Sequence, residues 1–194
     1  MTGIANIALA QGPANEPFFG FVRFLLEFDG NDGDITTTDS SSYEHTVSRV
    51  FGVNATTAEI SNAASISGGT STNLLSSSST NGAGWELPSG QPTLTLTDTA
   101  DWTVELWFQP IGPTSSLAPV QYLLHNSTGS NGIGIYYQGN PTVNRRMYAR
   151  VNNTLIFTPL FNPVWEAGTW THVALVRDGT TCYLYTDGIM NATT

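Results

Sequence analysis

Acid–base cleavage of a glycosidic bond is one chemistry against which the acidic side chains of this sequence can be tested. That reaction uses two carboxyl groups flanking the bond, about 5–5.5 Å apart in retaining enzymes and about 6.5–9.5 Å apart in inverting ones. The alternating segment 102–108 carries Glu105, with Thr103 and Trp107 on the same face, and Asp101 precedes the segment. Because Glu105 has no partner carboxylate at close spacing, we expect it to be a hydrogen-bonded structural residue and the protein not to be an enzyme.

Five side chains that offer oxygen ligands cluster between residues 29 and 39, where they could hold a calcium ion. They are Asp29, Asn31, Asp32, Asp34 and Asp39. Counted from Asp29, the run departs from the EF-hand loop, whose sixth position is glycine but is Asp34 here. One interpretation is a calcium site with Asp29 and Asp39 as ligands. The other is that these Asp-Gly and Asn-Asp-Gly sequences only form turns. The sequence implies no other cofactor.

Aromatic side chains close to asparagines are the remaining candidates for binding. A sugar ring can stack on an aromatic side chain while polar groups bond its hydroxyls, and Tyr137 and Trp165 are the two residues we select for that role. His172 is expected to be a packed structural histidine. Cys182, the one cysteine of the chain, lies in an alternating run that predicts a buried small hydrophobic residue.

Charge excludes two classes of partner. The six cationic residues are all arginine, against 15 Asp and Glu, which gives a net charge of −9. Nucleic-acid binders gain most of their affinity by neutralising phosphates, and anionic membranes likewise attract cationic surfaces. We therefore expect neither nucleic acid nor membrane to be a partner.

The elements that must position these residues are short strands. Alternating segments occur at 21–28, 46–53, 102–108, 121–125, 132–137, 146–151, 171–177 and 181–186. Asp178-Gly179 between the last two segments is a strong hairpin signal, and Asp187-Gly188 predicts a further turn. No long segment has helical periodicity, so the chain is predicted to be all-β, a two-sheet antiparallel sandwich.

Domain organisation follows from composition. Residues 1–20 carry one charge, Glu16, and several apolar side chains, which fits either a loose tail or an extended N-terminal arm that docks on a partner. The sandwich is assigned to residues 21–194. Since the sequence stops soon after the Asp187-Gly188 turn, we expect the sandwich to lack its last strands, which a longer chain or a neighbouring copy would supply.

Three motifs in a fixed order resemble the concanavalin A-like lectin/glucanase superfamily, in its laminin-G-like form. They are residues 25–41, with the run Leu26-Glu27-Phe28-Asp29-Gly30, residues 101–108, and residues 168–188. The resemblance covers residues 21–190 and implies a concanavalin A-like jelly roll. Some relatives bind calcium at the loop rims, and domains of this superfamily recur in phage structural proteins.

These observations favour a non-enzymatic structural protein of a phage virion, as a head decoration, fibre or tail component. The expected partners are other virion proteins, further copies of the chain in a homo-oligomer such as a trimer, and cell-surface glycans. The main alternative is a carbohydrate-binding module or adhesin domain of a bacterial surface protein. A glycoside hydrolase or lyase is the third interpretation.

Overall fold

Every regular element that the computed structural model describes is a β-strand, as the sequence predicts. The described residues are 24–28, 31, 33–51, 55–61, 71–76, 83–86, 100–109, 120–128, 131–140, 144–152, 154–157 and 168–194. They belong to two compact units, Asn6–Thr95 and Leu96–Thr194. The expected arm, residues 1–20, lies outside the described residues. Among the helices and strands that are described, none is a helix of the length and apolarity needed to cross a membrane.

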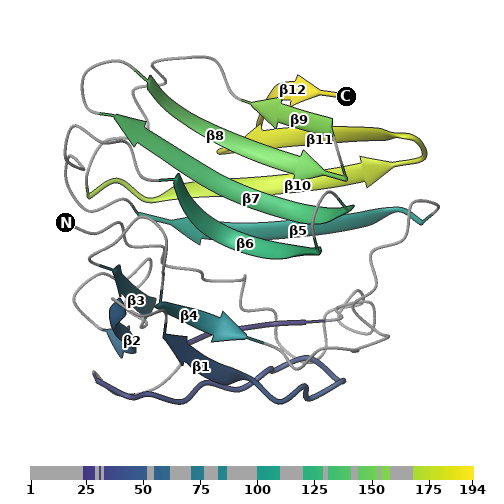
Figure 1. The fold of residues 1–194 in the computed structure, drawn as a ribbon. Helices are drawn as coiled ribbons and strands as arrows, with labels where there is room; N and C mark the ends of the chain where they lie inside the picture. The colour runs from purple at the N-terminus through teal and green to yellow at the C-terminus, as the bar shows by residue number, and fades with distance from the viewer. Residues whose placement is uncertain are drawn as a thin grey trace. The chain divides into compact units, whose positions relative to one another are not determined.

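The Leu96–Thr194 unit contains two four-stranded antiparallel sheets (Figure 1). One sheet has the order β12-β11-β10-β5, with β5 at Trp102–Phe108, β10 at Thr171–Asp178, β11 at Thr181–Thr186 and β12 at Ile189–Thr193. The other has the order β6-β7-β8-β9, with β6 at Val120–Thr128, β7 at Asn131–Asn140, β8 at Asn144–Val151 and β9 at Thr154–Phe157. We call them the β5 sheet and the β7 sheet.

The core of this unit lies between the two sheets. Side chains alternate along each strand, so that in β5 Leu106 and Phe108 are buried while Thr103 and Glu105 are exposed. Phe108 of β5 meets Tyr137 of β7, with the ring centroids 5.5 Å apart, which shows that the inner faces pack against each other. The buried residues of both sheets are Leu106, Phe108, Leu123, Ile133, Ile135, Tyr137, Met147, Ala149, Val151, Ile156, Val173, Leu175, Cys182 and Leu184. The prediction that Cys182 is buried is confirmed.

Two tight turns join β10, β11 and β12, as the Asp-Gly sequences predict. Asp178 pairs with Thr181, which leaves Gly179 and Thr180 as the loop, and Gly179 has φ +59°. A glycine with positive φ in the first loop position is typical of a type II′ turn. Asp187 and Gly188 both have positive φ, the pattern of a type I′ turn, and lead into β12. The chain continues after this turn as β12, a strand that the sequence analysis did not assign.

The Asn6–Thr95 unit contains two antiparallel strand pairs. β1 (Ser48–Phe51) pairs with β4 (Ala83–Glu86), and β2 (Ala55–Ser61) pairs with β3 (Ser71–Ser76). A small core combines buried Leu26 and Phe28 with Phe24, Val47 and Trp85. The predicted inward face of segment 21–28 is thus confirmed for its described part.

The strand predicted for this segment is not formed over Phe24–Phe28. That stretch makes a single bridge, Leu26 to Asp39, and Phe28 has φ +54°, outside the β region. The backbone N–H of Leu25 donates to the side chain of Asp39, 14 residues further along the chain, and not to a neighbouring strand.

Candidate functional site

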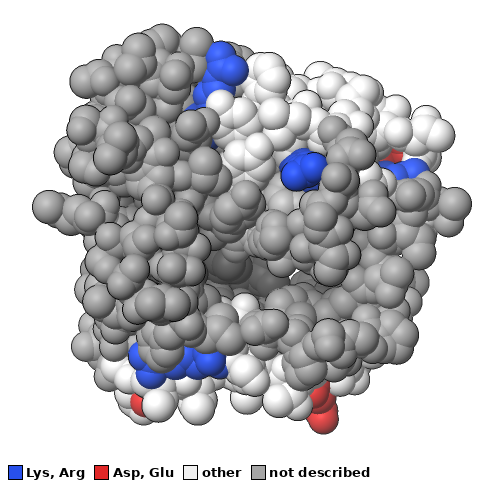
Figure 2. All heavy atoms as spheres, viewed as in Figure 1, with Lys and Arg blue, Asp and Glu red and all other residues white. Residues whose placement is uncertain are grey.

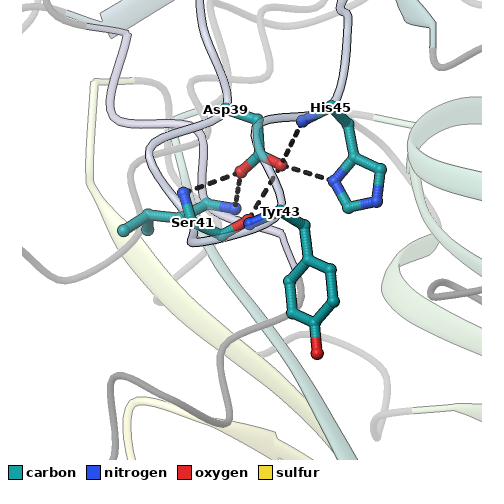
Figure 3. Close-up of polar contacts among 5 residues, drawn as sticks. Asp39, Ser41, Tyr43 and His45 are labelled. Atoms are coloured by element: carbon teal, nitrogen blue, oxygen red, sulfur yellow. Dashed lines mark hydrogen bonds and ion pairs between the residues drawn. The ribbon is translucent and has the colours of Figure 1, made fainter.

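The most densely bonded polar group among the described residues is the carboxylate of Asp39 (Figure 3). Its Oδ1 accepts hydrogen bonds from the backbone N–H groups of Leu25 and Ser41, both at 2.9 Å. Its Oδ2 accepts from Ser41 Oγ at 2.9 Å, from the His45 N–H at 3.0 Å and from His45 Nδ1 at 2.5 Å. An ionised carboxylate only accepts hydrogen bonds, so His45 Nδ1 carries the hydrogen in this contact.

The protonation of Asp39 follows from these bonds. Burial by itself would raise the pKa of the carboxyl, because it disfavours the charged form. Hydrogen bonds from the Leu25 and Ser41 N–H groups, from the His45 ring and from the His45 N–H outweigh that effect and bring the pKa below its ordinary value of 3.8. Asp39 is therefore an anion at neutral pH, and it ties three separate stretches of the loop together.

This geometry bears on the calcium interpretation. Both oxygens of Asp39 already accept from protein donors, so a cation there would have to displace N–H groups that point at the carboxylate. Asp29, the other predicted ligand, lies outside the described residues. In the described stretches no group of three or more His, Cys, Asp or Glu is placed to hold a metal ion. Calcium at Asp29 and Asp39 stays a prediction.

The turn interpretation has direct support at Asp34. Its Oδ2 accepts from the Asn31 N–H at 2.7 Å, and its own N–H donates to the Asn31 carbonyl at 3.0 Å. Gly33 between them has φ +88°, a conformation that glycine adopts without strain. Asn31 and Asp34 thus close a local turn, which is the role that Asn-Asp-Gly sequences commonly play.

Glu105 lies on the outer face of the β5 sheet, where it meets His172. Glu105 Oε2 is 3.4 Å from His172 Nε2, and the His172 ring packs on Trp107 with centroids 5.0 Å apart. The two side chains keep 43% and 24% of their exposure. The expectation that His172 is packed and bonded to a neighbour is confirmed.

Two carboxylates at the end of these strands, those of Asp101 and Asp178, are too far from Glu105 for paired-carboxylate chemistry. Asp101 precedes Glu105 by four positions, and Asp178 follows Ala174, the cross-strand partner of Glu105, by four. At about 3.3 Å per residue each lies roughly 13 Å away along the strand. Asp101 Oδ1 also accepts from the Gly179 N–H at 2.7 Å, which fixes it at the hairpin. Neither separation fits the spacing that glycoside hydrolysis requires.

Of the two predicted sugar-binding aromatic residues, the structure describes one. Tyr137 points into the core of the sandwich against Phe108 and is only 4% exposed. Trp165 lies outside the described residues. The structure therefore makes Tyr137 a core residue, while Trp165 as a sugar-binding residue stays a prediction.

The outer face of the β7 sheet carries a row of aromatic side chains. Tyr136, Tyr148 and Phe157 occupy cross-strand positions of β7, β8 and β9. Tyr136 and Tyr148 stack with centroids 5.0 Å apart and planes at 3°, and Phe157 follows at 6.0 Å from Tyr148. The guanidinium carbon of Arg146 lies 4.8 Å above the Phe157 ring, a cation–π contact. We call these four residues with Arg150, which also lies on this face of β8, the aromatic–arginine face.

A match to a family model covers residues 79–194, and its description is the concanavalin A-like lectin/glucanase superfamily. The chain belongs to this superfamily. A comparison with curated proteins and a comparison with solved structures each found no match. The match contains both sheets of the sandwich and therefore Glu105, His172 and the aromatic–arginine face. The Asp39 cluster precedes it.

The sequence analysis did not name the residues of the aromatic–arginine face as candidate binding residues. The signal was present, because Arg146, Tyr148 and Arg150 alternate with Met147 and Ala149 along one predicted strand. A second signal was the absence of any Asp or Glu from Gln109 to Trp165 in a chain with 15 acidic residues. What the sequence could not supply was the register, which sets Phe157 and Tyr136 on either side of Tyr148.

Proposed function

We propose that the chain is a non-enzymatic attachment protein of a phage particle, whose lectin-type sandwich serves assembly or adhesion to a cell surface. The observation that carries the attachment role is the aromatic–arginine face, on a domain of the concanavalin A-like lectin/glucanase superfamily. A sheet face with partly exposed tyrosines and arginines offers hydrogen-bond donors to a ligand. The particle role is supported by the apolar, nearly uncharged residues 1–20 and by the recurrence of domains of this superfamily in phage structural proteins.

The non-enzymatic part of the proposal is supported by the surroundings of Glu105. Glu105 contacts His172, whereas Asp101 and Asp178 are roughly 13 Å away along the strands. We expect the protein to release no reducing ends from polysaccharides, and Glu105→Gln to leave that result unchanged. Cleavage by the unmodified protein that Glu105→Gln abolishes would show that Glu105 is catalytic and would overturn this part.

The particle role is tested by quantitative mass spectrometry of purified particles from the source. A fixed copy ratio to the major shell protein is the expected result, and that ratio distinguishes a head component from a tail component. Absence from particles combined with binding on a glycan array would favour the second candidate. That candidate is a carbohydrate-binding module or adhesin domain of a bacterial surface protein, and the aromatic–arginine face supports it equally well.

A further inference from the structure

The β7 sheet differs in charge from the rest of the chain. Its four strands and their connections, residues 120–157, contain no Asp or Glu. The same segment holds Arg145, Arg146 and Arg150, three of the six cationic residues of a protein with a net charge of −9. Figure 2 shows blue arginine atoms among white ones over β7 and β8. An isolated positive sheet in an acidic chain points to a negatively charged ligand.

The outward side chains are arranged for a ligand with repeated charges. Arg146 and Arg150 are four positions apart on β8, roughly 13 Å along the strand, with Tyr148 between them. The Arg146 guanidinium carbon lies 4.8 Å from the centre of the Phe157 ring, and the Arg146 Nε is buried with no hydrogen-bond partner among the described residues. Two cations on either side of an aromatic row suit anionic groups that recur along an extended chain better than one isolated phosphate.

The ring geometry distinguishes between kinds of polyanion. Tyr136 and Tyr148 stack on each other, and Phe157 lies between Tyr148 and the Arg146 guanidinium. Single-stranded nucleic acid binds by stacking its bases on open aromatic faces, whereas here Tyr136 and Tyr148 stack on each other and Arg146 lies over the ring of Phe157. What the row offers to a ligand is ring edges and the Tyr148 hydroxyl, which donates a hydrogen bond to a carboxylate or sulfate oxygen.

We infer that the aromatic–arginine face binds an extended anionic polysaccharide, whose carboxylate or sulfate groups pair with Arg146 and Arg150 while its hydroxyls meet the tyrosine edge. The inference rests on the proposed attachment function and names the class of glycan that this function serves. Guanidinium groups suit this role because their planar donors match the two oxygens of a carboxylate or sulfate group.

Affinity electrophoresis of the full chain tests the inference with matched polymers. The charged probes are polygalacturonate and dextran sulfate, and the neutral counterparts are methyl-esterified polygalacturonate and dextran. We expect retardation by at least one charged probe, none by its neutral counterpart, and a loss of retardation as sodium chloride is raised. The probe that binds identifies the anionic group as carboxylate or sulfate.

Variants locate the binding face. Arg146→Gln is expected to weaken binding to that probe about tenfold, the loss of one charge-assisted hydrogen bond of about 1.4 kcal/mol. Tyr148→Phe, which keeps the ring stack, is expected to weaken binding several-fold. Arg177→Gln and Tyr183→Phe change the same residue types on the β5 sheet and should bind as the unmodified protein does. Far-ultraviolet circular dichroism and thermal melting will show whether each of the four variants folds.

Four outcomes overturn the inference. Equal binding of charged and neutral polymers, or binding to neutral array glycans alone, removes the anionic preference but leaves the attachment function standing. An equal loss in Arg177→Gln removes the assignment to the β7 sheet. Stronger binding to a single-stranded oligonucleotide than to both charged polysaccharides replaces the ligand class. Failure to bind any glycan, charged or neutral, overturns both this inference and glycan attachment.

Discussion

A buried carboxylate with five donors makes the stability of the 24–45 loop dependent on its charge. The pKa of Asp39 is lower in the folded protein than its ordinary value of 3.8, so the folded state binds this proton less readily than the unfolded state does. The contribution of Asp39 to stability is therefore complete above the ordinary value. It is lost as the pH falls through the folded value.

Asp39→Asn is expected to lower the free energy of unfolding at pH 7 by about 2 kcal/mol or more, because an amide group then faces N–H donors in place of an acceptor oxygen. Chemical denaturation followed by tryptophan fluorescence measures the change. As the pH is lowered from 6 to 3, the gap between the unmodified protein and the variant should shrink.

Asp34→Asn is the matched control, since Asp34 is a partly exposed aspartate of the same loop with one short contact to a backbone N–H. Its cost should stay below about 1 kcal/mol. A gap between the unmodified protein and Asp39→Asn that stays constant with pH would contradict the assignment of a lowered pKa to Asp39.

Two adjacent tyrosines show how far a single sequence can predict which side chains face a ligand. Tyr136 and Tyr137 are adjacent and equally suited to meet a sugar by type. Because side chains of a strand alternate between faces, the structure places Tyr137 against Phe108 in the core and Tyr136 outside against Tyr148. Composition and spacing identify both tyrosines, but only the pairing of β7 with its neighbours tells them apart.

At the scale of elements, the predictions succeeded where the determining interactions are local. Strand β5 occupies Trp102–Phe108 as its alternation predicts, and Asp-Gly sequences mark both turns of the β10–β12 meander. The stretch Phe24–Phe28 has equally clear alternation but forms one bridge, because its partner is the side chain of Asp39, 14 residues from Leu25. Hydrophobic alternation predicts which side chains are buried. It does not predict which groups accept or donate the hydrogen bonds of the backbone.

Gly179 is the position at which the β10–β11 hairpin is most sensitive to substitution. Its φ of +59° disfavours any residue with a Cβ, while a Cβ at this position would meet nothing within 4 Å. Gly179→Ala is therefore expected to destabilise the protein by about 1–2 kcal/mol through the backbone alone. Thr180→Ala in the same loop, where φ is not positive, should change stability by less than about 0.5 kcal/mol. Equal effects of the two substitutions in a thermal melt would contradict the assigned turn.

At the scale of the whole molecule, the proposed particle role makes residues 1–20 the docking arm. A chain without residues 1–20 should keep the melting temperature and the polysaccharide binding of the full chain but fail to incorporate into particles. Light scattering of both forms reports whether the arm also joins copies in a homo-oligomer. Normal incorporation of the shortened chain would show that docking uses another surface, and it would leave the sandwich and its ligand face unaffected.

The separation of charge between the two sheets affects how the Leu96–Thr194 unit approaches a negatively charged polymer. Arg146 and Arg150 lie on one sheet of the Leu96–Thr194 unit, whereas Glu105 and Asp178 lie on the other. Such a unit carries an electric dipole across its thickness, so the field of a negatively charged polymer rotates it before contact and turns the arginine side forward. Salt then acts mainly on the rate of association, since it shortens the distance over which the orienting torque is felt. Because the whole chain has a net charge of −9, this orientation would act only at short range, once the unit has come close to the charged polymer.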